Sequence, residues 1–124
     1  MSDGVNFPGG IPRATEVLLP QSNLVSLEGV EQPLIEYAVH LAYIHWLLFA
    51  SPLVVMSGRD SATPCSPLHA GGLAIDLRIH ELMPDEIVLW YALLGHSAEA
   101  RLIDFHPGRA AGGERFTHLE LHAP

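Results

Sequence analysis

The sequence predicts a single small α+β domain in which a mostly antiparallel sheet is backed by two helices. Its length of 124 residues fits one compact domain. Apolar residues make up 48% of the chain and charged residues 16%, which is enough apolar material for a packed core. The predicted elements follow in the order helix, strand, strand, helix, strand, strand. This order implies an α+β fold.

The first thirty residues differ in composition from the rest. Residues 1–30 are rich in Pro, Gly, Ser and Asn, and we expect them to form an irregular arm. The apolar island Val17-Leu18-Leu19, closed by Pro20, leaves room for one edge strand in this arm. The domain itself is predicted to span residues 31–124.

Helical periodicity starts where the arm ends. Between residues 31 and 50 the apolar side chains recur at helical spacing over a wide stripe, which predicts a buried helix that ends at Ser51-Pro52. A second helix is expected to begin at Pro84, because proline suits the first helical position and acidic residues follow it. We expect this helix to run to Leu94, with Gly95 as its stop.

Four apolar runs predict strands. Residues 53–56 are short, apolar and rich in β-branched side chains, and residues 72–79 alternate as a strand does. Residues 100–106 and 115–122 predict an antiparallel hairpin joined by a long loop over residues 107–113.

The net charge argues against nucleic acid as a partner, and the length of the longest apolar stretch argues against a membrane span. Fourteen acidic against six basic residues give a net charge of −8, which repels a phosphate backbone, so nucleic acid is not an expected partner. The longest apolar stretch, residues 34–50, contains Glu36, His40 and His45 and is shorter than the roughly 20 residues of a bilayer span. The N-terminal residues show no export signal, so we expect synthesis in the cytoplasm.

A histidine and an aspartate at a spacing of seven form the first chemical signal. His69 is followed by Gly72, Ala74 and Asp76, so that a nitrogen ligand in a loop precedes an oxygen ligand in the next strand. The small residues between them let both groups reach one ion. The single Cys65 cannot form an internal disulfide or a thiolate cage, which leaves histidine and carboxylate ligands. Such ligands suit a catalytic zinc.

The last predicted strand supplies the second signal. Residues two apart in a strand face the same way, so His118, Glu120 and His122 share one face. His118 is the expected third ligand. His122 lies so near the end of the sequence that we interpret it as a frayed-end residue rather than a ligand.

These motifs resemble the zinc D-Ala-D-Ala carboxypeptidase-like peptidoglycan peptidases, which include phage endolysins and the Hedgehog signalling domain. Ser57-Gly58-Arg59, the segment from His69 to Asp76 and Phe116-x-His118-x-Glu120 match the family motifs over residues 33–122. The chain departs from them in three places. It lacks an aromatic residue before Arg59, it has Ser66 three rather than two residues before His69, and it lacks the Glu-x-x-His of many members.

The resemblance implies a fold like that of the Hedgehog domain and a set of site residues. Zinc would be held by His69, Asp76 and His118. Glu120, or failing it Glu114, would act as general base. The resemblance further implies that Arg59 and Ser57 bind the substrate carboxylate or the developing oxyanion, and it includes Ser66 among the substrate-binding residues.

The leading interpretation is a zinc peptidase that cuts peptide bonds in bacterial cell-wall peptide, of carboxypeptidase or endopeptidase type. A phage or prophage origin fits this activity, with action in the periplasm or cell wall after phage-type release, or in a virion. The alternative is an inactive metal-binding or virion-structural module with the same fold, which the missing Glu-x-x-His favours. A third interpretation is a small α+β domain without metal.

The other sequence features give weaker evidence of a chemical function. The sequence has no G-x-S-x-G motif, which argues against a Ser-His-Asp hydrolase, and it is too short for the usual double-stranded barrel of non-haem iron enzymes. We interpret His40 and His45 as helix-face or core residues. His80, His96 and His106 have no partner at a usable spacing.

Overall fold

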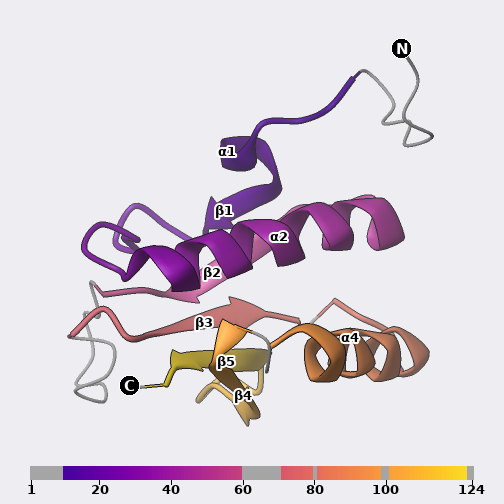
Figure 1. Ribbon diagram of the computed structural model, residues 1–124. Helices are drawn as coiled ribbons and strands as arrows, with labels where there is room; N and C mark the ends of the chain where they lie inside the picture. The colour runs from indigo at the N-terminus through magenta and orange to yellow at the C-terminus, as the bar shows by residue number, and fades with distance from the viewer. Residues whose placement is uncertain (1–9, 60–70, 80, 99–100, 123–124) are drawn as a thin grey trace.

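The computed structural model describes residues 10–59, 71–79, 81–98 and 101–122, which form three helices and one five-stranded sheet (Figure 1). The elements are α1 (Ala14–Val17), β1 (Leu18–Pro20), α2 (Gln32–Phe49), β2 (Leu53–Ser57), β3 (Ala74–Arg78), α4 (Pro84–Ser97), β4 (Ile103–Arg109) and β5 (Arg115–Leu121). The strand order is β1-β2-β3-β5-β4, and all neighbours except β1 and β2 are antiparallel. The expected α+β class with a mostly antiparallel sheet is therefore confirmed.

The arm contributes the edge strand that its apolar island predicted. β1 pairs in parallel with β2, with Leu18 opposite Leu53. A helix of one turn, α1, precedes it and buries Val17 in the core. The arm is therefore part of the sheet at one edge, and β4 forms the other edge.

The two long helices and one sheet face enclose the core. In Figure 1, α2 runs across the view between β1 and β3, and α4 lies at the lower right. Side chains from both helices join inward-facing strand residues in one apolar cluster, in which Tyr37, Trp90, Ile75, Leu77 and Leu119 are fully buried. His45 of α2 is 5% exposed, and its Nδ1 lies 2.8 Å from the Ser51 carbonyl. Burial lowers the pKa of His45, which accords with a neutral core residue.

Several predicted boundaries are wrong, among them the start of the first hairpin strand, which begins at Ile103 rather than at residue 100. α4 does not stop at Gly95 but continues to Ser97, where Ala98 N donates to the Leu94 carbonyl at 2.9 Å. The burial of Leu94 and Ala98 outweighs the low helix propensity of one glycine. The hairpin loop is also shorter than expected, because the first three residues of the expected loop, 107–109, pair with β5 as part of β4.

A buried hydroxyl fastens α4 to β5. Thr117 is fully buried on the core face of β5, and Trp90 Nε1 donates to its Oγ1 at 3.0 Å. The hydroxyl of Tyr91 lies 2.9 Å from the same oxygen. Because Trp90 is itself fully buried, its N–H has no access to water if this acceptor is lost.

We predict that Thr117→Val lowers the free energy of unfolding by about 1–3 kcal/mol, because it leaves the buried Trp90 N–H without its acceptor. Urea unfolding followed by tryptophan fluorescence measures the change. Thr117→Ser is the matched control, since it keeps the hydroxyl and removes one methyl, with a smaller loss of about 1 kcal/mol. A valine variant as stable as the wild type would show that this hydrogen bond is not needed.

Candidate functional site

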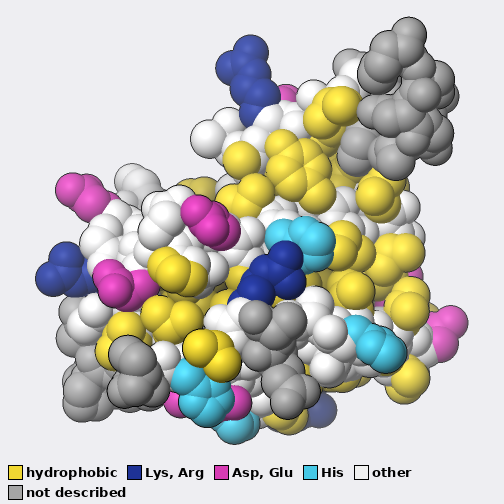
Figure 2. Space-filling model, viewed as in Figure 1, with side chains coloured by type: hydrophobic (Ala, Val, Ile, Leu, Met, Phe, Trp, Pro, Cys, Tyr) yellow, Lys and Arg dark blue, Asp and Glu magenta, His cyan; other side chains and the backbone are white. Residues whose placement is uncertain are grey.

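The strand β5 separates the core from a polar sheet face. Thr117 and Leu119 point into the core, and His118 and Glu120 therefore point to the opposite face. The alternation that the sequence predicted for this strand is confirmed. Figure 2 shows histidine and acidic side chains grouped together at the lower edge of the view.

Asp76 and His118 meet on this face. They are paired in register on the neighbouring strands β3 and β5. The distance from Asp76 Oδ1 to His118 Nδ1 is 2.7 Å, and Glu120 Oε1 lies 2.9 Å from the other ring nitrogen, Nε2. All three side chains are partly buried, with 17–29% of their surfaces exposed. One imidazole is thus held between two carboxylates.

The two carboxylates favour the protonated ring. The pKa of His118 is raised above 6.5, chiefly by the hydrogen bond with Asp76, whose charge also raises it. Burial acts in the opposite direction, and Glu120 adds a smaller raising effect. The two carboxylates therefore favour a proton on the ring, and a metal ion bound there would compete with that proton.

The motif glycine has a structural role at this site. Gly72 has φ +78°, a conformation that glycine adopts without strain, and a Cβ there would lie 2.3 Å from the Gly29 carbonyl oxygen. Its own carbonyl accepts a hydrogen bond from Glu31 N at 2.9 Å. The turn before β3 is thereby held against the segment that leads into α2.

The other predicted site residues divide into two groups. His69 and Ser66 lie outside the described residues. Ser57 is opposite Asp76 across a β-bulge in β2, one strand away from the Asp76–His118 pair. Arg59 is exposed and packs against Gly29, where an added Cβ would meet its guanidinium nitrogen at 2.2 Å.

Glu114, the second candidate for the general base, is engaged elsewhere. Its Oε2 lies 3.4 Å from Nε of Arg78, which also pairs with Glu81 at 2.9 Å. Glu120, by contrast, contacts His118 directly. Of the two candidates, Glu120 is thus the one that contacts a predicted ligand, through the ring nitrogen on the side away from Asp76.

Sequence reasoning missed two residues of this face, His106 and Asp104, and it misjudged the role of a third, His122. His106 is in register with His118, and their rings stack with centroids 6.2 Å apart. Asp104 is in register with Glu120, and it pairs with His122 Nε2 at 2.7 Å. His122 is therefore held by a carboxylate rather than frayed. The pairing of these two strands was predicted, but their register, which no local motif encodes, was needed to reveal these contacts.

The donors at the site fit zinc in kind. A carboxylate oxygen and an imidazole nitrogen facing each other from neighbouring strands are ligands that zinc takes. Within the described ranges no group of three or more His, Cys, Asp or Glu residues is arranged to hold a metal ion. The expected third ligand, His69, is outside those ranges.

Comparisons with protein-family models, with curated proteins and with solved structures found no match. Among the described residues, none of the helices is long and apolar enough to cross a membrane.

The paired carboxylates give a pH prediction for the metal-free protein. Because the pKa of His118 is raised, their pairing contributes stability that is fully present below pH 6.5 and is lost as the pH rises through the raised pKa. Asp76→Asn should lower the pKa of His118 more than Glu120→Gln does, since the Asp76 hydrogen bond is the largest cause.

Titration of the histidine ring protons by NMR measures the pKa of His118 in the wild type and in the two variants, and so shows which variant lowers it more. Glu36→Gln, at an exposed carboxylate of α2 that pairs with Gln32, is the control and should leave the His118 titration unchanged. A pKa of His118 at or below 6.5 in the wild type would contradict the prediction.

Proposed function

We propose that the protein is a zinc-dependent peptidase that hydrolyses peptide bonds in bacterial cell-wall peptide. The observation that carries the proposal is the 2.7 Å contact between Asp76 and His118, two residues that the motifs predicted as ligands of one ion. They are 42 positions apart in sequence and meet on neighbouring strands, on the sheet face opposite the core. The family resemblance supplies the reaction and the substrate class.

The proposed ligands are His69, Asp76 and His118. When bound there, zinc would polarise the scissile carbonyl and acidify a water molecule. His118 faces Asp76 through Nδ1, so this nitrogen is the one placed to share an ion with the carboxylate. The ring's other nitrogen is held by Glu120, which fixes the orientation of the imidazole.

The remaining steps belong to side chains of the chain itself. Glu120 would accept the proton of the attacking water and pass it to the leaving amine. Ser57, opposite Asp76, lies on the β2 side of the ligand pair, where its hydroxyl could bind a substrate oxygen. Arg59, two residues further, would supply positive charge for a substrate carboxylate.

The alternative is a metal-binding or virion-structural module that keeps this site without hydrolysis. One observation favours it: Glu120 is engaged with the ring nitrogen of His118, as expected for a residue that positions a ligand rather than one that moves protons. For either function the place of action would be the cell wall or periplasm, reached by phage-type release or within a virion.

We predict that the protein binds about one zinc ion and that Asp76→Ala or His69→Ala abolishes tight binding, because two ligands rarely hold a catalytic zinc. Elemental analysis and titration with a chromogenic chelator measure stoichiometry and affinity. Asp104→Asn, at another carboxylate of the same sheet face, is the control and should keep the zinc. Unchanged affinity in Asp76→Ala would refute the ligand assignment.

For the reaction, we predict that Glu120→Gln keeps zinc and lowers turnover of purified peptidoglycan by about 10²-fold or more, the effect of losing a positioned proton carrier. Glu114→Gln should have a smaller effect, since Glu114 pairs with Arg78. Amine release from peptidoglycan, with and without a chelator, gives the rate. A wild type that binds zinc but releases no amine would favour the inactive module.

A further inference from the structure

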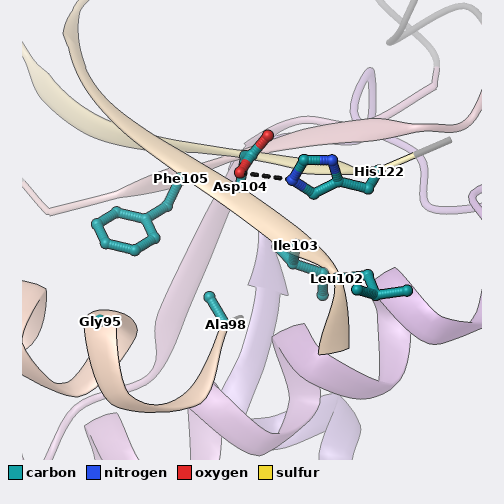
Figure 3. Close-up of a pocket in the computed structure, with 7 residues that line it drawn as sticks. All are labelled: Gly95, Ala98, Leu102, Ile103, Asp104, Phe105 and His122. Carbon is teal, nitrogen blue, oxygen red and sulfur yellow. Dashed lines mark ion pairs between the residues drawn. The ribbon is translucent and has the colours of Figure 1, made fainter. Parts of the chain in front are cut away.

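The helix α4 borders a cavity beside each half of its length. One lies between the end of α4 and β4, and its carboxylate, Asp104, is paired with His122 at 2.7 Å (Figure 3). The other has a volume of about 350 Å³ and lies between the first half of α4 and the hairpin end of β4 and β5. We call it the arginine pocket, and its lining residues are Ile79, Ile87, Tyr91, Pro107, Gly108, Arg109, Arg115 and Phe116.

The arginine pocket is on the α4 side of the sheet, across from the candidate site. Thr117 points into the core, and Arg115, two residues before it, points to the same side. Pro107 and Arg109 of β4 are in register with Thr117 and Arg115, so they share this side. His118 points to the opposite side. A ligand in this pocket would therefore be separate from the proposed zinc ligands and from the peptide of the proposed function.

Two arginines face each other at the pocket. Arg109 is directly opposite Arg115 in the pairing of β4 with β5, and these are two of the six basic residues in a chain with a net charge of −8. Like charges directly opposite one another destabilise an antiparallel pair. Asp104 and Glu120 are a like-charged pair across the same strands, and there a histidine contacts each carboxylate. In the same way, an anion between the two arginines would reduce their repulsion.

Hydrogen bonds to backbone carbonyls hold both guanidinium groups near the pocket. Arg115 Nη2 donates to the Leu82 carbonyl at 3.1 Å, and Arg109 Nη1 donates to the Gly113 carbonyl at 3.4 Å. Each guanidinium has five N–H donors in a planar fork, which matches the two oxygens of a carboxylate. Arg109 is exposed and Arg115 is partly buried, so an anion can reach them from solvent.

The apolar wall of the pocket is held in place before any ligand binds. The ring of Tyr91 stacks on Phe105 with centroids 6.0 Å apart, and its hydroxyl lies 2.9 Å from Thr117 Oγ1. Ile79 is 3% exposed, and Ile87 is partly buried on α4. A wall that is already ordered loses little conformational entropy when a ligand packs against it.

We propose that the arginine pocket binds a small organic acid, with its carboxylate between Arg109 and Arg115 and its apolar body against Tyr91 and the two isoleucines. Apolar walls with a few polar groups are typical of small-ligand pockets, and the volume is within their range. A bare inorganic anion would leave the apolar wall in water, and a neutral apolar molecule would leave the arginines repelling each other. The two features together therefore select an acid with an apolar body.

The experiment titrates the full chain with phenylpropionate and with two matched probes. Phenylpropanamide has the same body without the charge, and acetate has the same head group without the body. Amide shifts of Ile87, Tyr91, Arg109 and Arg115 in NMR spectra give the dissociation constants. We expect the acid to bind about tenfold more tightly than either probe, the effect of one charge-assisted hydrogen bond or of a partly buried ring.

A second titration with a chelator present distinguishes this pocket from a metal site, because a carboxylate can also bind zinc. The dissociation constant of the acid should be unchanged, since the arginine pocket is on the other side of the sheet from His118.

Two variants test the role of the arginines. Arg109→Gln removes one of the two facing charges at an exposed position, and it should remove most of the preference for the acid and leave amide binding unchanged. Arg101→Gln is the matched control. Arg101 is also exposed and also donates to a backbone carbonyl at 3.4 Å, but it is not among the residues that line the pocket. This variant should keep the preference for the acid.

Several results would overturn the proposal. Equal affinity for the acid and the amide would show that the arginines do not bind the carboxylate, and equal affinity for the acid and acetate would show a surface anion site without a pocket. Loss of acid binding on chelation, or shifts confined to Asp76 and His118, would place the acid at the candidate metal site. If phenylpropionate shifts none of the four amides, the pocket does not bind this class of ligand.

Discussion

The orientation of the strand β5 depends on one buried hydroxyl, that of Thr117. Trp90 donates to Thr117 from α4, so the helix and the strand are joined by a directed bond as well as by apolar contact. Because successive residues of a strand point to opposite faces, fixing Thr117 inward also fixes His118 outward. A slip of one residue would bury the imidazole and expose the threonine. The position of His118 beside Asp76 therefore follows from packing on the opposite side of the sheet.

The two carboxylates of the site favour a positive charge on the imidazole between them. Asp76 and Glu120 contact the same imidazole, so a neutral ring would leave two carboxylates with no positive charge between them. Protonation of His118 relieves this imbalance, as the raised pKa indicates. A metal ion on the Nδ1 side would relieve it in another way, and proton and metal would compete for the ring. The same geometry thus favours a protonated histidine in the free protein and permits a ligand in the loaded one.

Local sequence patterns predicted which helices and strands form better than they predicted which residues lie next to one another in the folded chain. Helical periodicity located α2, and alternation located β5 and the outward face of His118, because both signals are set by the local backbone. The expected helix end at Gly95 was wrong because it rested on the low helix propensity of glycine and took no account of how α4 packs around that residue. Asp104 and His106 were missed because strand register depends on the whole sheet. The structure was therefore needed to show which side chains contact His118. The sequence alone was enough to choose Asp76 and His118 as candidates.

Pro107 in β4 has a consequence for solubility. An edge strand presents unpaired backbone groups on which another chain can extend the sheet, and such pairing leads to aggregation. Proline has no backbone N–H, so Pro107 interrupts any ladder that forms along the outer edge of β4. The other edge strand, β1, has three residues and also ends in a proline. In the part of the chain that the structure describes, both margins of the sheet thus resist growth into a longer sheet.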